Sequence, residues 1–375
     1  MDFDPSDDQR LLVESVSRLL ADNYSFAQRK TYLTKPEGFS PDMWGKFAEL
    51  GLLGLPFPEE YGGFGGGAQE VMLVMQAFGR VLVLEPFLST VVLGGTAIQA
   101  AGNKEQKMVL LPAIADGSLK LAFAHGERQA RYDLTDVVTT AKQNGTGWIL
   151  DGSKTVVSHG EAADKLIVSA RTGGERYHED GITLFLVDTS AQGVARRGYT
   201  TRDETRAADV SLSNAHGEVL GEVGKGLAVI EKIVEAGIAA TAAETVGAME
   251  AMNEMTLEYS KTRVQFGQPI GSYQVVQHRL ADMFMAQEQG RSMAMLATMS
   301  VDNEDDAERR HDFALAKVGV GQSGRYVSQS AVQMHGGIGM TEEYAVGHYF
   351  RRCMVIERLF GDPAYYLQRL ANEIA

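Results

Sequence analysis

The chain has 375 residues, a formal net charge of −14 at pH 7 and one cysteine, Cys353. The acidic balance argues against a nucleic acid partner, since phosphate binding requires a basic surface, and a single cysteine excludes an intrachain disulfide. We find no apolar run long enough to span a membrane, no apolar segment typical of a signal peptide and no histidine spacing typical of a metal site. We therefore expect a cytoplasmic protein that binds no metal.

Residues 1–117 are predicted to form a helical domain. Ser6 and Gln9 have the spacing of a capping box, and apolar residues then recur at the helical period. Ser40 can cap a further helix, with Pro41 at its first position. The stretch PEEYGGFGGG that follows has the composition of a loop. It lacks the Lys-Ser or Lys-Thr pair of a phosphate-binding loop, so a tight surface loop is the simpler interpretation.

Residues 118–225 change to a strand pattern. Short apolar or β-branched runs, such as WILDGSK, DKLIVSARTG and ITLFLVD, replace the helical period. Three pairs are typical of hairpin turns and separate these runs, at residues 144–145, 151–152 and 180–181. We predict a compact antiparallel β domain.

Residues 226–375 return to helix. The first segment has no proline for nearly 40 residues and keeps an apolar stripe at the helical period. A second helix is expected from about Val275, a third over 307 to about 333, and a last one from about His348. Long helices with short connections predict a four-helix bundle.

Two stretches in this helical region contain residues suited to a ligand. In RVQFGQPIGSYQVVQHRLADM, Arg263 is a forked donor that fits a phosphate, and Phe266 offers a flat apolar face. In QMHGGIGMTEEY, Gln333 provides an amide beside Gly336 and Gly337, where a ligand can approach the backbone. Taken alone, each stretch is also explained by a tight turn or by close packing of helices.

Taken together and in this order, the two stretches resemble the acyl-CoA dehydrogenase family. The family pattern R-x-x-F-G-x-P-I, followed by Q and L-A-D-M, matches the first stretch, and Q-x-x-G-G-x-G matches the second. The resemblance implies a mostly α fold with a central β domain: an N-terminal helical domain over 1–117, a middle β domain over 118–225 and a C-terminal four-helix bundle over 226–375. LGLLGLPFPEEYGGFGGG and LFGDPAYY resemble most closely the small subunit of pimeloyl-CoA dehydrogenase and related subunits of heteromeric members.

The family resemblance implies an FAD-dependent α,β-desaturation of an acyl-CoA thioester. A glutamate takes the α-proton, and the β-hydrogen leaves as hydride to the flavin. An electron-transferring flavoprotein is the acceptor that the resemblance implies. The family resemblance also assigns Arg263 to the cofactor pyrophosphate and Phe266 to the adenosine half. The same end of the site would also include Gln274, Gln333, Gly336 and Gly337.

The β domain departs from the family where the flavin ring is expected. The family's Thr-Glu-Pro and Gly-Ser-Asp elements align with HGERQARYDL, in which Glu127 and Asp133 match. Arg131 and Tyr132 stand at the positions of the glycine and the serine, and Val156 replaces the tryptophan of the next element. We expect the flavin-cradling half of the site to be degraded and the nucleotide-binding half to be intact.

The family's catalytic glutamate is also missing. It precedes the glycine of a C-terminal Glu-Gly-Thr, a place that Phe360 occupies here, and the alternative glutamate position holds Gly237. Glu244 lies seven residues further along the same helix face and is a candidate for a relocated base. The simpler interpretation of Glu244 is a buried or interface carboxylate.

These departures suggest a small subunit of an α2β2 complex, in which a homologous large subunit supplies the glutamate. One alternative is a self-sufficient homotetrameric acyl-CoA dehydrogenase with Glu244 as base. Another is a non-catalytic structural subunit that binds no nucleotide, and a third is a flavin oxidase or monooxygenase. The acyl group is left open among dicarboxyl, medium-chain and steroid side-chain thioesters.

Overall fold

The computed structural model describes residues 5–145 and 147–374, and the chain forms two compact units. Unit 1 consists of Met1–Thr31, Ala68–Val83 and Ile238–Ala375, and unit 2 consists of Tyr32–Gly67 and Leu84–Gly237. Both units therefore combine segments from distant parts of the chain. The three-domain boundaries expected from the sequence stay a prediction.

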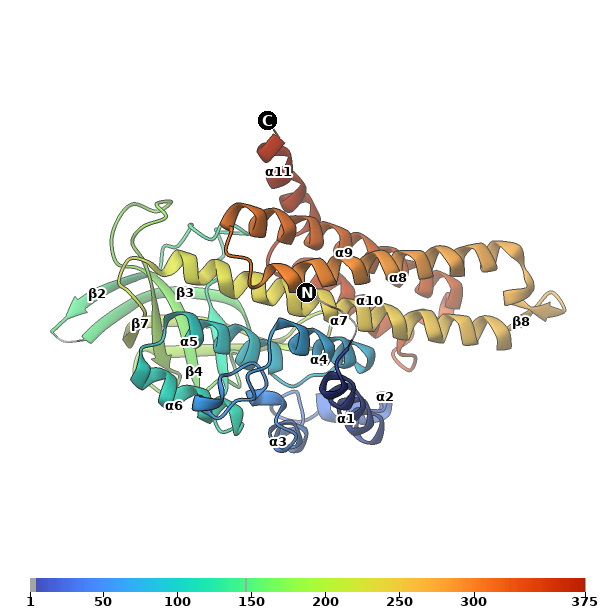
Figure 1. Cartoon of the computed structure of the whole chain (residues 1–375), viewed down its shortest axis with the longest axis horizontal. Coiled ribbons are helices and arrows are strands. Elements are labelled where there is room, and N and C mark those ends of the chain that lie inside the picture. The colour runs from blue at the N-terminus through green and yellow to red at the C-terminus, as the bar shows by residue number, and fades with distance from the viewer. Residues whose placement is uncertain (1–4, 146, 375) are drawn as a thin grey trace. The chain divides into compact units, whose positions relative to one another are not determined.

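Unit 1 is built mainly from helices and also contains one small two-stranded sheet (Figure 1). Its first helix begins at the expected capping box, because Ser6 Oγ accepts from Gln9 N and the Gln9 side chain accepts from Ser6 N. The third long C-terminal helix is capped by Asp305, whose carboxylate accepts two N–H groups of the first turn. The helices are α1 (Asp7–Asn23), α2 (Phe26–Leu33, ending in unit 2), α4 (Ala68–Val81), α7 (Gly226–Thr262, starting in unit 2), α8 (Gln274–Ser300), α9 (Asp306–His335), α10 (Val346–Ile356) and α11 (Pro363–Ile374).

The apolar core of unit 1 joins four helices. Met249 and Met252 of α7 pack with Met283 of α8, Val327 of α9 and Cys353 of α10, all of them buried. This arrangement confirms the predicted C-terminal helical domain. Across the part of the chain that the structure describes, no helix is long and apolar enough to cross a membrane.

Helix α4 approaches α7 closely because both helices carry glycine at the contact. A Cβ on Gly247 would lie 1.9 Å from the carbonyl oxygen of Gln76, and a Cβ on Gly79 would lie 2.0 Å from that of Glu244. No side chain fits at such distances, so glycine at these two positions sets the spacing of the two helices.

Unit 2 contains the β-sheet and short helices. The helical segments are α3 (Pro41–Glu49), η1 (Leu52–Gly54), η2 (Glu59–Tyr61), η3 (Leu88–Gly94), α5 (Gly95–Ala101) and α6 (Lys104–Ala115). Ser40 caps α3 as expected, with its Oγ accepting from Met43 N, and Pro41 is the first residue of the helix. The glycine-rich stretch after η2 is a loop, as predicted.

The sheet of unit 2 has the order β1-β4-β2-β3-β7-β5, and β6 pairs with β7. The expected antiparallel sheet is correct for most pairs but wrong for β4, which pairs in parallel with β1 and, through Thr140 and Arg171, with β2. The chain between β1 and β4 forms the β2–β3 hairpin, and this long connection permits a parallel pairing. The strands are β1 (Leu121–Ala124), β2 (Thr140–Asn144), β3 (Gly147–Ser158), β4 (Lys165–Arg171), β5 (Ile182–Asp188), β6 (Val194–Thr200) and β7 (Arg206–Leu220).

One predicted hairpin turn is wrong. Asp151 and Gly152 lie inside β3, where the register with β7 shifts between Leu150 and Gly152. Gly152 has φ 153°, and its missing Cβ would lie 2.5 Å from Thr139 Oγ1. The Asp-Gly pair therefore forms a bulge within one strand, a position that glycine also favours.

Candidate nucleotide-binding end and the catalytic position

A two-residue turn at the tip of a small hairpin presents the first sequence-predicted site residues. Strands β8 (Val264–Gln265) and β9 (Gln268–Pro269) flank Phe266 and Gly267, which have φ values of 55° and 84°. Positive φ at both central residues is the geometry of a type I′ turn. For a bulky aromatic residue this backbone conformation is strained. The Phe266 side chain is nevertheless 94% exposed, so its packing within this chain does not account for the strain.

Arg263 lies at the base of this hairpin. Its backbone N–H donates to Tyr259 O (2.8 Å), and its carbonyl accepts from Ile270 N (2.8 Å), so the backbone is fixed where α7 ends. The side chain is exposed, and its guanidinium has no hydrogen-bond or ion-pair partner among the described residues. Gln274, the first residue of α8, is likewise exposed and follows the short helix η4 (Ile270–Ser272). This segment thus holds an unpaired cation beside an unpaired aromatic ring.

The second predicted group lies where α9 ends. Gln333 is exposed in the last turn of α9, and Gly336 and Gly337 begin the short helix η5 (Gly336–Met340). A Cβ at either glycine would meet no atom within 4 Å. The space beside this backbone is therefore open within the chain, as the approach of a ligand requires.

An aromatic stack that the sequence analysis missed joins the two groups. The ring of Tyr259 in α7 stacks on His335 at a centroid distance of 4.5 Å, and the ring of Tyr344 lies tilted against His335 at a centroid distance of 5.0 Å. Tyr344 Oη lies 3.2 Å from His335 Nε2. Since Arg263 follows Tyr259 by one helical turn and Gly336 follows His335 directly, the stack places both groups at one end of unit 1. The four-residue spacing of Tyr259 and Arg263 is visible in the sequence, but no linear pattern links Tyr259 to His335.

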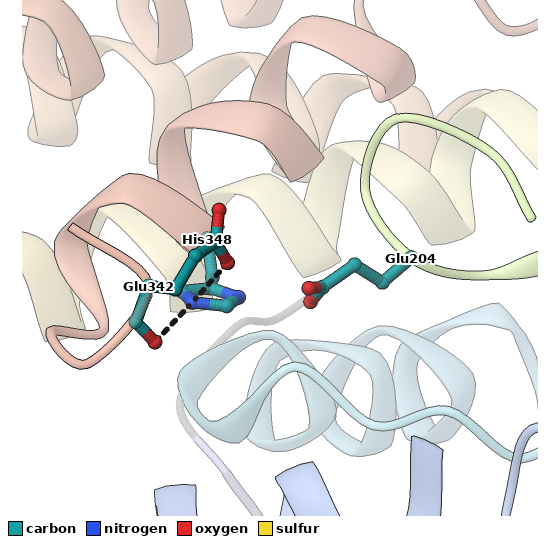
Figure 2. Close-up of side chains that lie close together, drawn as sticks. All are labelled: Glu204, Glu342 and His348. Atoms are coloured by element: carbon teal, nitrogen blue, oxygen red, sulfur yellow. Dashed lines mark hydrogen bonds and ion pairs between the residues drawn. The ribbon is translucent and has the colours of Figure 1, made fainter. Parts of the chain in front are cut away.

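The loop after the glycines is fastened to α10 through Glu342. Arg351 donates to both carboxylate oxygens of Glu342, at 2.7 and 3.0 Å. Figure 2 shows His348 beside Glu342, with Nε2 3.2 Å from the Glu342 carbonyl oxygen and 3.5 Å from its carboxylate. The third side chain drawn, Glu204, belongs to unit 2. The ties to α10 hold the loop that leads away from Gly336 and Gly337.

Glu244 is buried in unit 1 and engaged by an arginine. Arg352 of α10 donates from Nε to one carboxylate oxygen (2.6 Å) and from Nη2 to the other (2.8 Å). The side chains of Glu244 and Arg352 are 4% and 12% exposed. Both carboxylate oxygens are therefore occupied by donors of one guanidinium, in the bidentate geometry typical of a structural ion pair. The geometry favours the simpler interpretation of Glu244, a buried structural carboxylate.

Phe360 occupies the turn between α10 and α11. Its φ is 62°, its carbonyl accepts from Tyr366 Oη (2.7 Å), and Gly361 follows with φ 117°. The ring is half-buried and offers no atom that accepts a proton. This turn therefore carries no base at the position where the sequence pattern places one.

In unit 2, Glu127 is a buried carboxylate that forms an ion pair with a buried lysine. Lys154 Nζ, wholly buried, donates to Glu127 Oε1 (2.7 Å), Ser169 Oγ (3.0 Å) and the His125 carbonyl (3.2 Å). Glu127 also accepts from the backbone N–H of Thr139 (3.1 Å). Burial opposes ionisation of Glu127, but Lys154 lowers its pKa to about 2. Burial lowers the pKa of Lys154 to about 8, despite the neighbouring carboxylate. The sequence analysis noted Glu127 but missed its lysine.

Two positions where the family pattern is not matched have unusual backbone geometry. Val156 has φ 53° and is 57% exposed, at a register shift between Lys154 and Val157 in β3. Arg131 has φ 51° and is exposed, next to the half-buried Tyr132. A β-branched residue at positive φ is an outlier. The side chains that replace glycine and tryptophan thus stand on strained, outward-facing backbone.

Comparison with known proteins matches nearly the whole chain to models of one protein family. The N-terminal, middle and C-terminal domain models of acyl-CoA dehydrogenases match residues 6–118, 122–215 and 224–374. The acyl-CoA dehydrogenase FadE12 of Mycobacterium tuberculosis is 31% identical, over 92% of this chain and 90% of its own. The chain belongs to the acyl-CoA dehydrogenase family. The fold and the family expected from the sequence are confirmed, and as a family member the chain is an oxidoreductase acting on acyl-CoA.

Solved acyl-CoA dehydrogenase structures include chains that assemble with a different subunit. A variant of the Tcur3481–Tcur3483 steroid ACAD is 29% identical, with a TM-score of 0.89 over 98% of both chains. The ChsE4–ChsE5 complex from Mycobacterium tuberculosis contains a chain 26% identical, with a TM-score of 0.88 over 100% of this chain and 99% of that one. The comparisons do not single out the small subunit of pimeloyl-CoA dehydrogenase.

Proposed function

We propose that this chain is one subunit of a heteromeric FAD-dependent acyl-CoA dehydrogenase and that a homologous partner chain supplies the catalytic carboxylate. The observation that carries the proposal is the contrast between two places in unit 1. Arg263 and Phe266 stand exposed and unengaged at the nucleotide end, whereas Phe360 and the paired Glu244 leave the catalytic end without a free base.

The residues at the nucleotide end fit a dinucleotide. Arg263 offers an unpaired fork for the pyrophosphate, and Phe266 offers a flat surface for the adenine. Gly336 and Gly337 leave room for the cofactor to approach the backbone, and the exposed amides of Gln274 and Gln333 add polar contacts. Bound FAD would supply the hydride acceptor for the desaturation of the acyl-CoA. This chain would contribute binding and orientation from its side of a shared site.

The partner and the substrate class are also part of the proposal. We take the partner to be a homologous large acyl-CoA dehydrogenase subunit in an α2β2 assembly, and the two-component structures described above, which share this fold, support this choice. The electron acceptor would be an electron-transferring flavoprotein, by family membership. The acyl group is one that the partner's pocket selects, since Phe360 leaves no carboxylate here to meet the α-proton.

Flavin stoichiometry tests the proposal. The chain would be purified alone and after co-expression with a homologous chain from the same organism that keeps a glutamate before its C-terminal glycine. We expect no flavin on the chain alone and one FAD per pair of chains in the complex, with desaturation measured by dye reduction. One FAD per chain with turnover in a homo-oligomer would refute it and would return the base to Glu244.

Two variants separate binding from assembly. Arg263→Ala in the complex should lower flavin retention, while Arg18→Ala, which removes an exposed arginine of α1, should not. If flavin retention in the Arg263→Ala complex matched that of the Arg18→Ala control, the nucleotide role would be wrong. The chain would then be better described as the structural subunit considered above.

A further inference from the structure

A small internal cavity lies in unit 1 between α7, α9 and α10. Its volume is about 10 Å³, and its lining includes five side chains with polar atoms: Thr241, Thr245, Lys317, Cys353 and Glu357. A cavity of this size holds one water molecule when two to four polar groups surround it. A water molecule is expected in this cavity if the polar groups that line it lack other hydrogen-bond partners.

Glu357, at the C-terminal end of α10, has an unsatisfied oxygen. Its side chain is 3% exposed, and Oε1 accepts from Arg325 of α9. The other oxygen, Oε2, is buried and has no hydrogen-bond partner among the described residues. A buried carboxylate oxygen without a donor is destabilising, so native structures rarely leave one unpaired.

Lys317 of α9 has the opposite deficit, since its side chain has donor N–H groups without an acceptor among the described residues. The residue is 5% exposed, and its Nζ donates to the Ile356 carbonyl (2.7 Å), which uses one of three N–H groups. Burial lowers the pKa of Lys317 to about 7, against the opposing charges of Glu357 and Asp362. No ion pair or hydrogen bond joins Lys317 directly to Glu357 in the part of the chain that the structure describes.

We propose that the cavity is a binding site for one ordered water molecule, which accepts from Lys317 Nζ and donates to Glu357 Oε2. We assign its second hydrogen to the hydroxyl of Thr245, which also lines the cavity and donates its own proton to the Thr241 carbonyl (2.8 Å). Three hydrogen bonds are typical of a buried water.

The water completes a clamp on the turn after α10. Lys317 already holds the Ile356 carbonyl, Arg325 holds Glu357, and Tyr366 holds the Phe360 carbonyl. Bridging Lys317 to Glu357 links α9 to the end of α10 from inside the bundle. The turn that carries Phe360 is thereby fixed by contacts that do not depend on a cofactor or a partner, and the inference stands apart from the proposed function.

A crystal structure of the full-length chain, alone or with its partner, decides the matter. We expect one water peak within hydrogen-bond distance of both Lys317 Nζ and Glu357 Oε2. An empty cavity, or a direct contact between the ammonium and the carboxylate, would overturn the proposal. This result needs no variant and so does not depend on whether a mutant folds.

Water-¹⁷O relaxation dispersion gives a second measurement in solution. Lys317→Met should lose one long-lived internal water relative to the wild type. The control variant Arg358→Met changes the exposed residue that follows Glu357 and should lose none. An unchanged count in a folded Lys317→Met variant would contradict the assignment.

Discussion

Replacing Glu244 by glutamine tests whether this residue is a structural carboxylate or a base. The substitution keeps the shape of the side chain but leaves the Arg352 guanidinium, 12% exposed, without its countercharge. Removing one partner of a buried ion pair costs about 3–5 kcal/mol. Arg352 retains some access to solvent, and the amide can still accept one hydrogen bond. We therefore expect the free energy of unfolding to fall by about 3 kcal/mol, the lower end of this range.

The assay is urea and thermal unfolding followed by circular dichroism, beside turnover in the complex. An unfolding entropy of about 2 cal/mol/K per residue converts that loss into a fall in Tm of roughly 4 °C for 375 residues. The double variant Glu244→Gln with Arg352→Met should recover part of the loss, because it removes the uncompensated charge. Unchanged stability together with abolished turnover would refute the reasoning and identify Glu244 as the base.

Three further outcomes follow from the contacts described above. Phe266→Ala should leave the free energy of unfolding nearly unchanged or slightly higher, because the ring is 94% exposed, but should lower flavin retention in the complex; a large loss of stability by urea unfolding would contradict the first half. Gly247→Ala should destabilise the chain by about 2 kcal/mol or more, since its Cβ would meet α4 at 1.9 Å. The control Gly45→Ala, on the exposed face of α3, should stabilise the chain by about 0.5–1 kcal/mol. Equal Tm values for the two variants would count against the close contact. Lys154 lowers the pKa of Glu127 from 4.5 to about 2, against the effect of burial, so stability gained above pH 4.5 should be lost as the pH falls toward 2; Glu127→Gln should flatten that part of the pH profile, and an unaltered profile would show that the pair does not contribute.

Features set by neighbouring residues could be predicted from the sequence. The Ser6 capping box and the Ser40 cap depend on contacts three residues apart, and both are present in the structure. The long helices were located to within a few residues, because their apolar period extends over many turns. The bulge at Gly152 was missed because an Asp-Gly pair fits a hairpin turn and a bulge equally well, and only the pairing with β7 separates them.

Features that need a distant partner could not be predicted. Glu244 was a candidate base as long as Arg352, more than a hundred positions along the chain, was not known to lie against it. The stack of Tyr259 on His335 and the bond from Lys154 to Glu127 likewise join separate elements. The motif residues around Arg263 and Gly336 were found because a linear pattern marks them, whereas the contacts that hold these residues together leave no such pattern.

The burial of Cys353 gives the chain a natural reporter of motion. This residue is the sole cysteine of the sequence and lies 4% exposed in the core shared by α7, α8, α9 and α10, where burial raises the pKa of its thiol to about 12. A thiol reagent at neutral pH can therefore modify it only when the helices separate. The rate of labelling would measure how often the core of unit 1 opens, with no engineered probe, and a slower rate on adding the partner chain would report how strongly assembly suppresses that opening.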